Sequence, residues 1–338
     1  MPLLKYQFKP GIDKEGTSYT DEFGWYNSDK IRFRSGHPEK IGGWAKYSSS
    51  TFLGTARSLY NYASSSGTNY IGIGTHLKFY IADGSSYNDI TPIRATTSAG
   101  DVTFSATNGD ATITVADTAN GAVKNDFVTF SGAATLGGLI TADVLNQEYQ
   151  IATIVNANSY TIEAKDTDGD TVTANSSDSG NGGSSVVGAY QINVGLDEYV
   201  SGSGWGVNGW GDGTFGTAAT LDATNQLRIY SQDNFGDDLV FNPRAGGIYY
   251  WDESSGTSTR AVNFSSLGSA SNVPTKSLQI MVSDVDRHII CFGSNPIGSS
   301  TLDPLLVRWS DQESAVDWTP SSTNSAGGVK ISSGSKIV

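Results

Sequence analysis

The first of three related segments reads Ala56-Arg57-Ser58-Leu59-Tyr60-Asn61-Tyr62, Tyr70-Ile71-Gly72-Ile73-Gly74, Leu77-Lys78-Phe79-Tyr80-Ile81 and Asp89-Ile90-Thr91-Pro92. These four runs are rich in aromatic and β-branched residues, and turn-forming residues separate them. Such a pattern predicts four short β-strands joined by tight turns.

Two later segments repeat this order of features. The second contains Leu227–Tyr230, Asp238–Phe241, Gly247–Asp252 and Ala261–Phe264, and the third contains Leu278–Val282, His288–Phe292, Leu305–Trp309 and Ala315–Pro320. Repeated units of four antiparallel strands are typical of the blades of a β-propeller. We therefore expect an all-β fold with a β-propeller. Because a ring needs about four blades to close and three are recognisable, the propeller is expected to be incomplete within this chain.

The third run of each segment ends on an aromatic residue followed by an acidic one. The endings are Tyr80-Ile81-Ala82-Asp83, Tyr250-Trp251-Asp252 and Arg308-Trp309-Ser310-Asp311. We expect the rings to pack between neighbouring blades and the carboxylates to cap the turns that follow. At the C-terminal end, Val329–Ile331 and Lys336–Val338 are expected to form a strand, a turn and the start of another strand, so that blades continue beyond residue 338.

A region of different composition, residues 95–200, separates the first segment from the second and is rich in Thr, Ala, Asp and Asn. It predicts a small inserted β-sandwich or barrel, with a hairpin that turns at Asn108-Gly109. Asn175–Ser185 is expected to be a flexible loop. The strands expected in this insert are Val102–Ala106, Ala111–Val115, Phe127–Phe130, Glu148–Val155 and Ser159–Glu163.

The predicted organisation has five parts. They are an extended N-terminal arm with the first strands (1–54), a propeller blade (55–94), the inserted β-domain (95–200), a Gly/Trp-rich loop (201–225) and further blades (226–338). The loop places Trp205, Trp210 and Phe215 between glycines, which is incompatible with a regular strand or helix. Such rings can pack over the protein itself or serve as stacking platforms for a ligand.

Composition excludes several classes of function. The chain has 338 residues, a formal net charge of −13 and a charged fraction of 16 %. Its only compact basic cluster is Lys30, Arg32, Arg34 and Lys40, which argues against a protein that grips nucleic acid through phosphates. No segment resembles a membrane span or a signal peptide. The single cysteine, Cys291, lies in an apolar run and is expected to be a core residue.

Motifs that could carry chemistry are weak. Asp166-Thr167-Asp168-Gly169-Asp170 resembles the start of a calcium loop but lacks the closing glutamate, so a hairpin turn is favoured. Asp237-Asp238 and the Asp284/Asp286 pair could serve glycoside hydrolysis only at a suitable separation. The three histidines have no metal-ligand spacing. We therefore predict no catalytic residue, no cofactor and no metal site.

The N-terminal part resembles the tail nozzle, or tail-stabilisation, proteins of short-tailed bacteriophages. The matching stretches are Phe8–Ile12, Glu15–Thr17, Gly24–Tyr26, Asp29–Arg34, Pro38–Trp44, Tyr70–Ile81, Ser231–Asp237 and Asn242–Asp252. The resemblance rests on the order and number of these stretches, because none of them is a catalytic motif. It covers most of the chain outside the insert.

The resemblance implies a structural virion protein without enzymatic activity, assembled in the bacterial cytoplasm and located in the virion tail. It implies a hexameric ring beneath a tail adaptor protein, with tail fibre, needle or tip proteins as further partners. The ring would close the tail channel and conduct genomic DNA without sequence-specific binding and without membrane insertion. An acidic wall would suit passage of DNA.

Two alternatives remain open. A polysaccharide-degrading tail protein would use a pair of the acidic residues together with tryptophan platforms. A glycan-binding adhesin would use Trp205 and Trp210 for stacking on sugar rings.

Overall fold

The computed structural model describes residues 8–17, 19–20, 22–84, 86–198, 223, 226–334 and 337. Trp205, Trp210 and Phe215 of the predicted Gly/Trp-rich loop lie outside these residues, as do Lys336 and Val338. The chain divides into two compact units, residues 1–49 and 50–338, and each is described by itself.

The first unit, called the arm below, contains one β-hairpin. Strand β1 (Ile31–Arg34) pairs antiparallel with β2 (His37–Lys40). Trp25 is the centre of a small aromatic cluster, 5.8 Å from Phe8 and 6.0 Å from Phe33 between ring centroids. Among the described residues of the arm, no apolar side chain is fully buried.

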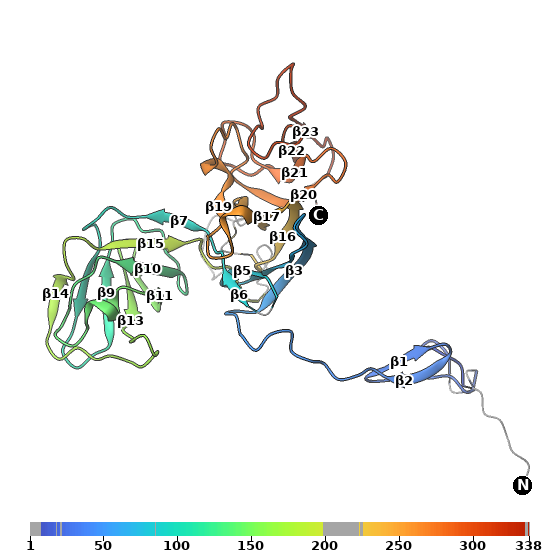
Figure 1. The fold of residues 1–338 in the computed structure, drawn as a ribbon, viewed down its shortest axis with the longest axis horizontal. Helices are drawn as coiled ribbons and strands as arrows, with labels where there is room; N and C mark the ends of the chain where they lie inside the picture. The colour runs from blue at the N-terminus through green and yellow to red at the C-terminus, as the bar shows by residue number, and fades with distance from the viewer. Residues whose placement is uncertain are drawn as a thin grey trace, which may run out of the picture. The chain divides into compact units, whose positions relative to one another are not determined.

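Three four-stranded antiparallel sheets of the second unit confirm the repeated four-strand pattern (Figure 1). In each sheet the strands are neighbours in chain order, and the described residues are all-β apart from single short helical turns. The first sheet contains β3 (Ala56–Ala63), β4 (Asn69–Thr75), β5 (Phe79–Ala82) and β6 (Tyr87–Asp89). The second contains β16 (Tyr230–Phe235), β17 (Asp238–Pro243), β18 (Tyr249–Trp251) and β19 (Val262–Asn263). The third contains β20 (Ser277–Val282), β21 (Ile289–Ser294), β22 (Leu306–Trp309) and β23 (Gly327–Lys330).

Three strand predictions in these sheets were wrong. The fourth strand of the first sheet is Tyr87–Asp89, so only the first residue of the predicted Asp89–Pro92 belongs to it. The first strand of the second sheet starts at Tyr230, where the predicted Leu227–Tyr230 ends, and it runs to a turn at Gly236, whose φ is 71°. The fourth strand of the third sheet is β23 and not Ala315–Pro320. Residues 315–320 instead form a loop whose Trp318 is buried against the second sheet.

Glycine explains why β23 takes the fourth place. Gly327 is paired with Trp309, and a Cβ at this glycine would lie 2.5 Å from Cζ2 of the tryptophan ring. Only a residue without a side chain can approach that ring so closely. The C-terminal strand expected at Val329–Ile331 therefore completes the third sheet and does not begin another one.

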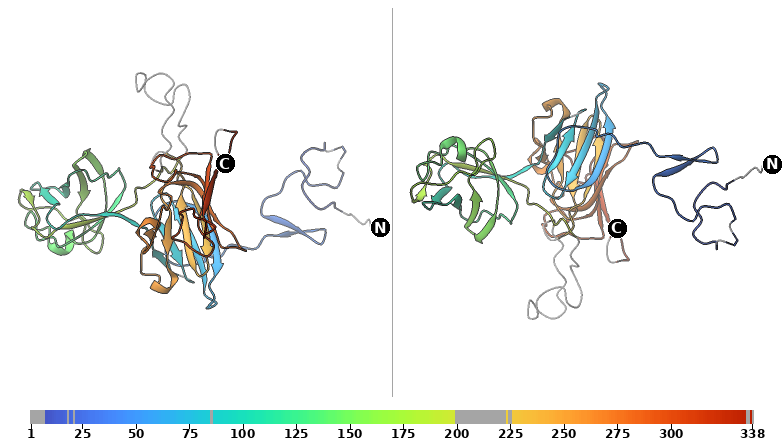
Figure 2. Two further views of the ribbon diagram at one scale, coloured as in Figure 1. Left: turned by 90° about the horizontal axis from the view of Figure 1, so that it is seen from above. Right: turned by 90° about the horizontal axis from the view of Figure 1, so that it is seen from below.

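The first strands of the three sheets lie next to one another, which is the arrangement of propeller blades around an axis. Strand β16 contacts both β3 and β20, and Figure 2 shows β3 and β16 side by side. Backbone N–H groups on the unpaired edge of β20 donate hydrogen bonds to side chains of β16. The N–H of Ile280 donates to Ser231 Oγ at 2.9 Å, and the N–H of Val282 donates to Asp233 Oδ2 at 2.8 Å.

Apolar cores fill the space between successive sheets. Between the first and second sheets, Phe79 and Phe241 stack with ring centroids 3.7 Å apart, and both rings are fully buried. Burial of aromatic rings on this scale is a major source of stability. A second cluster joins the second and third sheets through Val240, Ile248, Phe264, Ile280, Val282, Ile289, Cys291 and Trp318.

The insert is a β-sandwich, as expected, with its own buried core. One sheet has the order β11-β10-β15-β7 and the other β12-β13-β9-β8-β14. These strands are β7 (Ile93–Thr96), β8 (Thr103–Ala106), β9 (Thr112–Ala116), β10 (Phe127–Ser131), β11 (Glu148–Gln150), β12 (Thr153–Asn156), β13 (Ser159–Glu163), β14 (Asp178–Asn181) and β15 (Val187–Gln191). The helical turns in the described part of the chain are α1 (Ala142–Leu145), η1 (Glu253–Ser255) and η2 (Phe264–Ser266).

The predicted hairpin at Asn108-Gly109 is confirmed by the pairing of β8 with β9, and Gly109 has a φ of 83°. The single strand expected at Glu148–Val155 was wrong, because β11 and β12 belong to different sheets. The loop expected at Asn175–Ser185 contains the edge strand β14, which pairs with β8.

Candidate functional site

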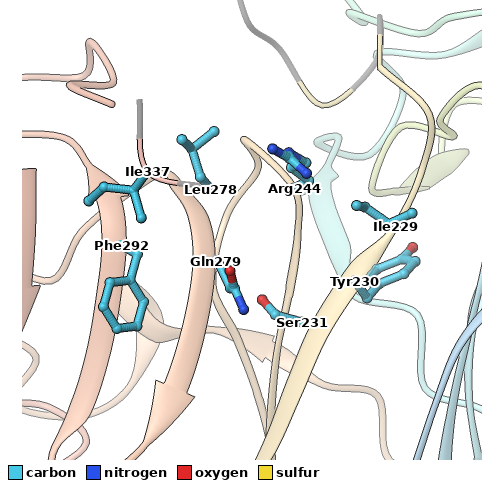
Figure 3. Close-up of a pocket in the computed structure, with 8 residues that line it drawn as sticks. All are labelled: Ile229, Tyr230, Ser231, Arg244, Leu278, Gln279, Phe292 and Ile337. Carbon is cyan, nitrogen blue, oxygen red and sulfur yellow. The ribbon is translucent and has the colours of Figure 1, made fainter. Parts of the chain in front are cut away.

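A cavity of about 210 Å³ lies where the first strands of the second and third sheets meet (Figure 3). Ser231 and Gln279 come from these two facing strands, and among the described residues Arg244 is the only charged one that lines the cavity. Its lining residues are Ile229, Tyr230, Ser231, Arg244, Leu278, Gln279, Phe292 and Ile337. Pockets for small ligands usually exceed about 300 Å³ and gather several polar groups.

The first strands present an almost uncharged surface. Arg57 on β3 and Asp233 on β16 are the only ionisable acidic or basic residues of β3, β16 and β20. Arg57 pairs with Asp197 at 2.7 Å. Asp233 accepts from the hydroxyl of Tyr60 at 2.8 Å, and burial together with this carboxylate raises the pKa of Tyr60 to about 12. The tyrosine is thus a permanent donor that ties β3 to β16.

The acidic residues considered for glycoside hydrolysis serve turns. Asp237 accepts from the backbone N–H of Ser65 at 2.7 Å, and hydrogen bonds from this serine lower the pKa of the carboxyl. Asp238 accepts from the hydroxyl of Tyr250 and from the N–H of Glu253. Asp284 and Asp286 are exposed in the turn between β20 and β21. The two neighbouring carboxylates therefore have different partners: Asp237 binds the β3–β4 turn, and Asp238 binds β18 and the helical turn after it.

The aspartate-rich segment of the insert forms a hairpin turn, as favoured from the sequence. The N–H groups of Asp168 and Asp170 donate to Asp166 Oδ1 at 3.0 Å and 2.8 Å. His37 lies on the arm hairpin, His76 in the first sheet's β4–β5 turn and His288 beside β21. Within the described part of the chain, no group of three metal-ligating side chains occurs.

Two of the three carboxylates that follow the third strands, Asp83 and Asp252, cap the next turn as predicted, whereas Asp311 binds Ser325, 14 residues further along the chain. Asp83 accepts from Ser86 Oγ at 2.8 Å, Asp252 from the N–H of Ser254 at 2.9 Å, and Asp311 from the N–H of Ser325 at 2.8 Å.

Only one of the three aromatic residues packs between sheets as expected. Trp251 is buried and lies 5.4 Å from Tyr70 of the first sheet between ring centroids. Tyr80 instead packs on Phe52, and Trp309 donates its indole N–H to the carbonyl of Ser325 at 2.7 Å.

Sequence reasoning missed an ion cluster that joins the first two sheets to the insert. Lys78 Nζ lies 2.7 Å from Asp89 and also contacts the carboxylate of Glu148 on β11. Arg260, in the connection between β18 and β19, lies 3.3 Å from Asp89 and 3.5 Å from Glu148. A lysine inside the apolar run Leu77–Ile81 was the available signal, because a buried lysine requires a partner.

The outer face of the third sheet, which points away from the second sheet, is apolar and partly exposed. The pairing register puts Met281, Ile290 and Trp309 in one row and Phe292, Val307 and Val329 in the next. Val329 is 54 % exposed and Met281 is 42 % exposed. On the opposite face, Ile280, Val282, Ile289 and Cys291 are buried against the second sheet. Cys291 is thus a core residue, as predicted, and burial raises the pKa of its thiol to about 12.

Comparisons with known proteins find a distantly similar solved structure and no family or curated match. No protein-family model matches the chain, and no curated protein matches it. One solved structure with some similarity is the phage phi92 endosialidase, at 14 % sequence identity and a TM-score of 0.22. The match covers 81 % of this chain and 38 % of that protein, so this chain spans well under half its length. A superposition of this quality carries no argument about function. No helix among the described residues is both long and apolar enough to cross a membrane.

Proposed function

We propose that this chain is a structural subunit of the tail of a short-tailed bacteriophage and forms its nozzle ring. The observation that carries the proposal is the outer face of the third sheet. Each of the other two sheets is covered by the next one on the corresponding face, whereas this face leaves Met281 and Val329 exposed. A contiguous apolar surface of this kind is typical of a subunit that assembles. The occupant we propose for it is part of a second copy of the chain.

Two further features support an assembly role over catalysis. The candidate acidic residues Asp237 and Asp238 accept hydrogen bonds from backbone N–H groups of turns. The first strands are nearly free of charge, and the chain as a whole is acidic at −13. Such a surface does not hold nucleic acid through its phosphates, so passing DNA would slide along it. The stretches that resemble nozzle proteins, such as Asn242–Asp252, occur in the same order along the chain, and this supports a location at the tail tip.

Quantitative mass spectrometry of gradient-purified phage particles tests this proposal by comparing the copy number of the chain with that of the portal protein. We expect a fixed ratio near one half. Absence from particles, or a ratio that varies between preparations, would contradict the structural role. Release of sugars from host polysaccharide by the purified chain would favour the polysaccharide-degrading alternative.

A further inference from the structure

The arm exposes large aromatic side chains that its own residues do not cover. Trp44 is 96 % exposed, Tyr19 is 94 % exposed and Tyr26 is 69 % exposed. Each such ring can bury about 150–250 Å² on contact with a partner. The described part of the arm has no fully buried apolar side chain, so its hairpin and aromatic cluster form no core of their own. Isolated two-stranded hairpins are marginally stable at best in water.

The arm and the rest of the chain, called the body below, carry opposite net charges. Residues 1–49 contain eight Lys and Arg against six Asp and Glu, a net charge of +2. The whole chain is at −13, which leaves −15 for residues 50–338. Arg34, Lys40 and Lys46 of the arm are exposed. Opposite charge draws the arm towards a body and helps to select it as the partner.

We propose that the arm of one copy docks on the outer face of the third sheet of a second copy. This face offers apolar side chains such as Met281 and Val329 to the arm's aromatic rings. A contact between two different surfaces of one chain is head-to-tail, and repeated contacts of this type form a ring when the rotation between subunits closes. An arm folded onto its own body would leave no such link. The inference therefore rests on the proposed ring, and adds to it the element that joins neighbouring subunits.

Isotope-resolved crosslinking of the full chain tests the docking. Trp44 is replaced by p-benzoylphenylalanine, and chains grown on ¹⁴N are mixed with chains grown on ¹⁵N, photolysed and digested. We expect crosslinked peptides of mixed label that join position 44 to residues 277–294 or 305–331. Crosslinks only within one label, crosslinks of mixed label confined to other regions, or no crosslinks would overturn the proposal. The same photoreactive residue at Val155, which is exposed on the insert, is the control and should give no mixed-label crosslinks to the third sheet.

A second measurement uses the dissociation constant for self-association of the purified chain. Trp44→Ser should weaken self-association about 30-fold or more, because a central aromatic contact contributes much of the binding free energy of an interface. Each factor of ten in the dissociation constant corresponds to about 1.4 kcal/mol. Val155→Ser should leave association unchanged. An unaltered dissociation constant for Trp44→Ser would refute the docking. Failure here with a fixed copy number in particles would reject the arm contact alone, whereas absence from particles would reject the nozzle itself.

Discussion

Replacing Lys78 by methionine tests whether burial makes the ion cluster strong. Lys78 Nζ lies 2.7 Å from Asp89 Oδ2, and the lysine side chain is only 4 % exposed. Methionine preserves most of the side-chain length but removes the charge, so Asp89 and Glu148 keep only Arg260 as a cationic partner. Removing one side of a buried ion pair costs about 3–5 kcal/mol, because the remaining charge stays desolvated. We expect Lys78→Met to lower the free energy of unfolding by this amount.

Lys330→Met is a matched control. Lys330 Nζ also lies 2.7 Å from a carboxylate, Oδ2 of Asp303, but its side chain is 62 % exposed. Exposed ion pairs contribute about 0–1 kcal/mol. Urea unfolding followed by far-ultraviolet circular dichroism measures both variants. Equal losses for Lys78→Met and Lys330→Met would refute the reasoning that burial, at equal distance, determines the energy.

The dependence on pH separates charge from packing. Burial raises the pKa of Asp89, but Lys78 and Arg260 outweigh this and hold it below its ordinary value. A carboxyl with a depressed pKa in the folded state stabilises the protein above its unfolded pKa of about 3.9, and loses that contribution as the pH falls through the folded pKa. The difference between the native protein and Lys78→Met should therefore shrink as the pH falls below about 4. A difference that stays constant would show that lost packing, and not lost charge, weakens the variant.

Three further predictions concern the sheet stack. Gly74→Ala should lower the free energy of unfolding by about 1–3 kcal/mol, because the new Cβ would lie 2.3 Å from a buried tyrosine ring. Gly268→Ala meets no atom within 4 Å and should leave stability nearly unchanged, and thermal unfolding compares the two variants. Cys291 should react with Ellman's reagent at pH 8 only after unfolding, since burial raises its pKa to about 12 and suppresses the thiolate; rapid reaction of the folded chain would contradict this. Asp233→Ala should lower the free energy of unfolding by about 1–3 kcal/mol, because it leaves the N–H of Val282 on the neighbouring strand unpaired. Asp284→Ala, in an exposed turn, should lower it by less than about 0.5 kcal/mol, and urea unfolding measures both variants.

Strands with dense apolar residues were predictable, and strands without them were not. Tyr70–Gly74 and Ser159–Glu163 show the expected alternation and are strands in the structure. Strand β14 has the sequence Asp-Ser-Gly-Asn and carries no such signal, because it is an edge strand that pairs through its backbone alone. Strand β23 begins with two glycines, and its place depends on the space beside the ring of Trp309.

Near the candidate site, contacts between residues close in the sequence were predictable, and contacts between distant segments were not. That Asp83 and Asp252 cap turns follows from their place after a strand, because each of these hydrogen bonds joins residues two or three positions apart in the sequence. The ion cluster was not predictable in the same way. Lys78 and Glu148 are 70 residues apart, and only the folding of the insert against the first sheet brings them together.

The all-β class, the repeated four-strand unit and the separate insert follow from the sequence, because strand formation and turns depend on near neighbours. The strand that completes the third sheet, the pairing of Ser231 and Asp233 with the edge of β20, and the apolar face that stays exposed become clear only from the folded chain. These features depend on contacts between segments distant in the sequence. The periodicity of a strand shows that two faces exist, but the face that receives a partner is fixed by what packs against it.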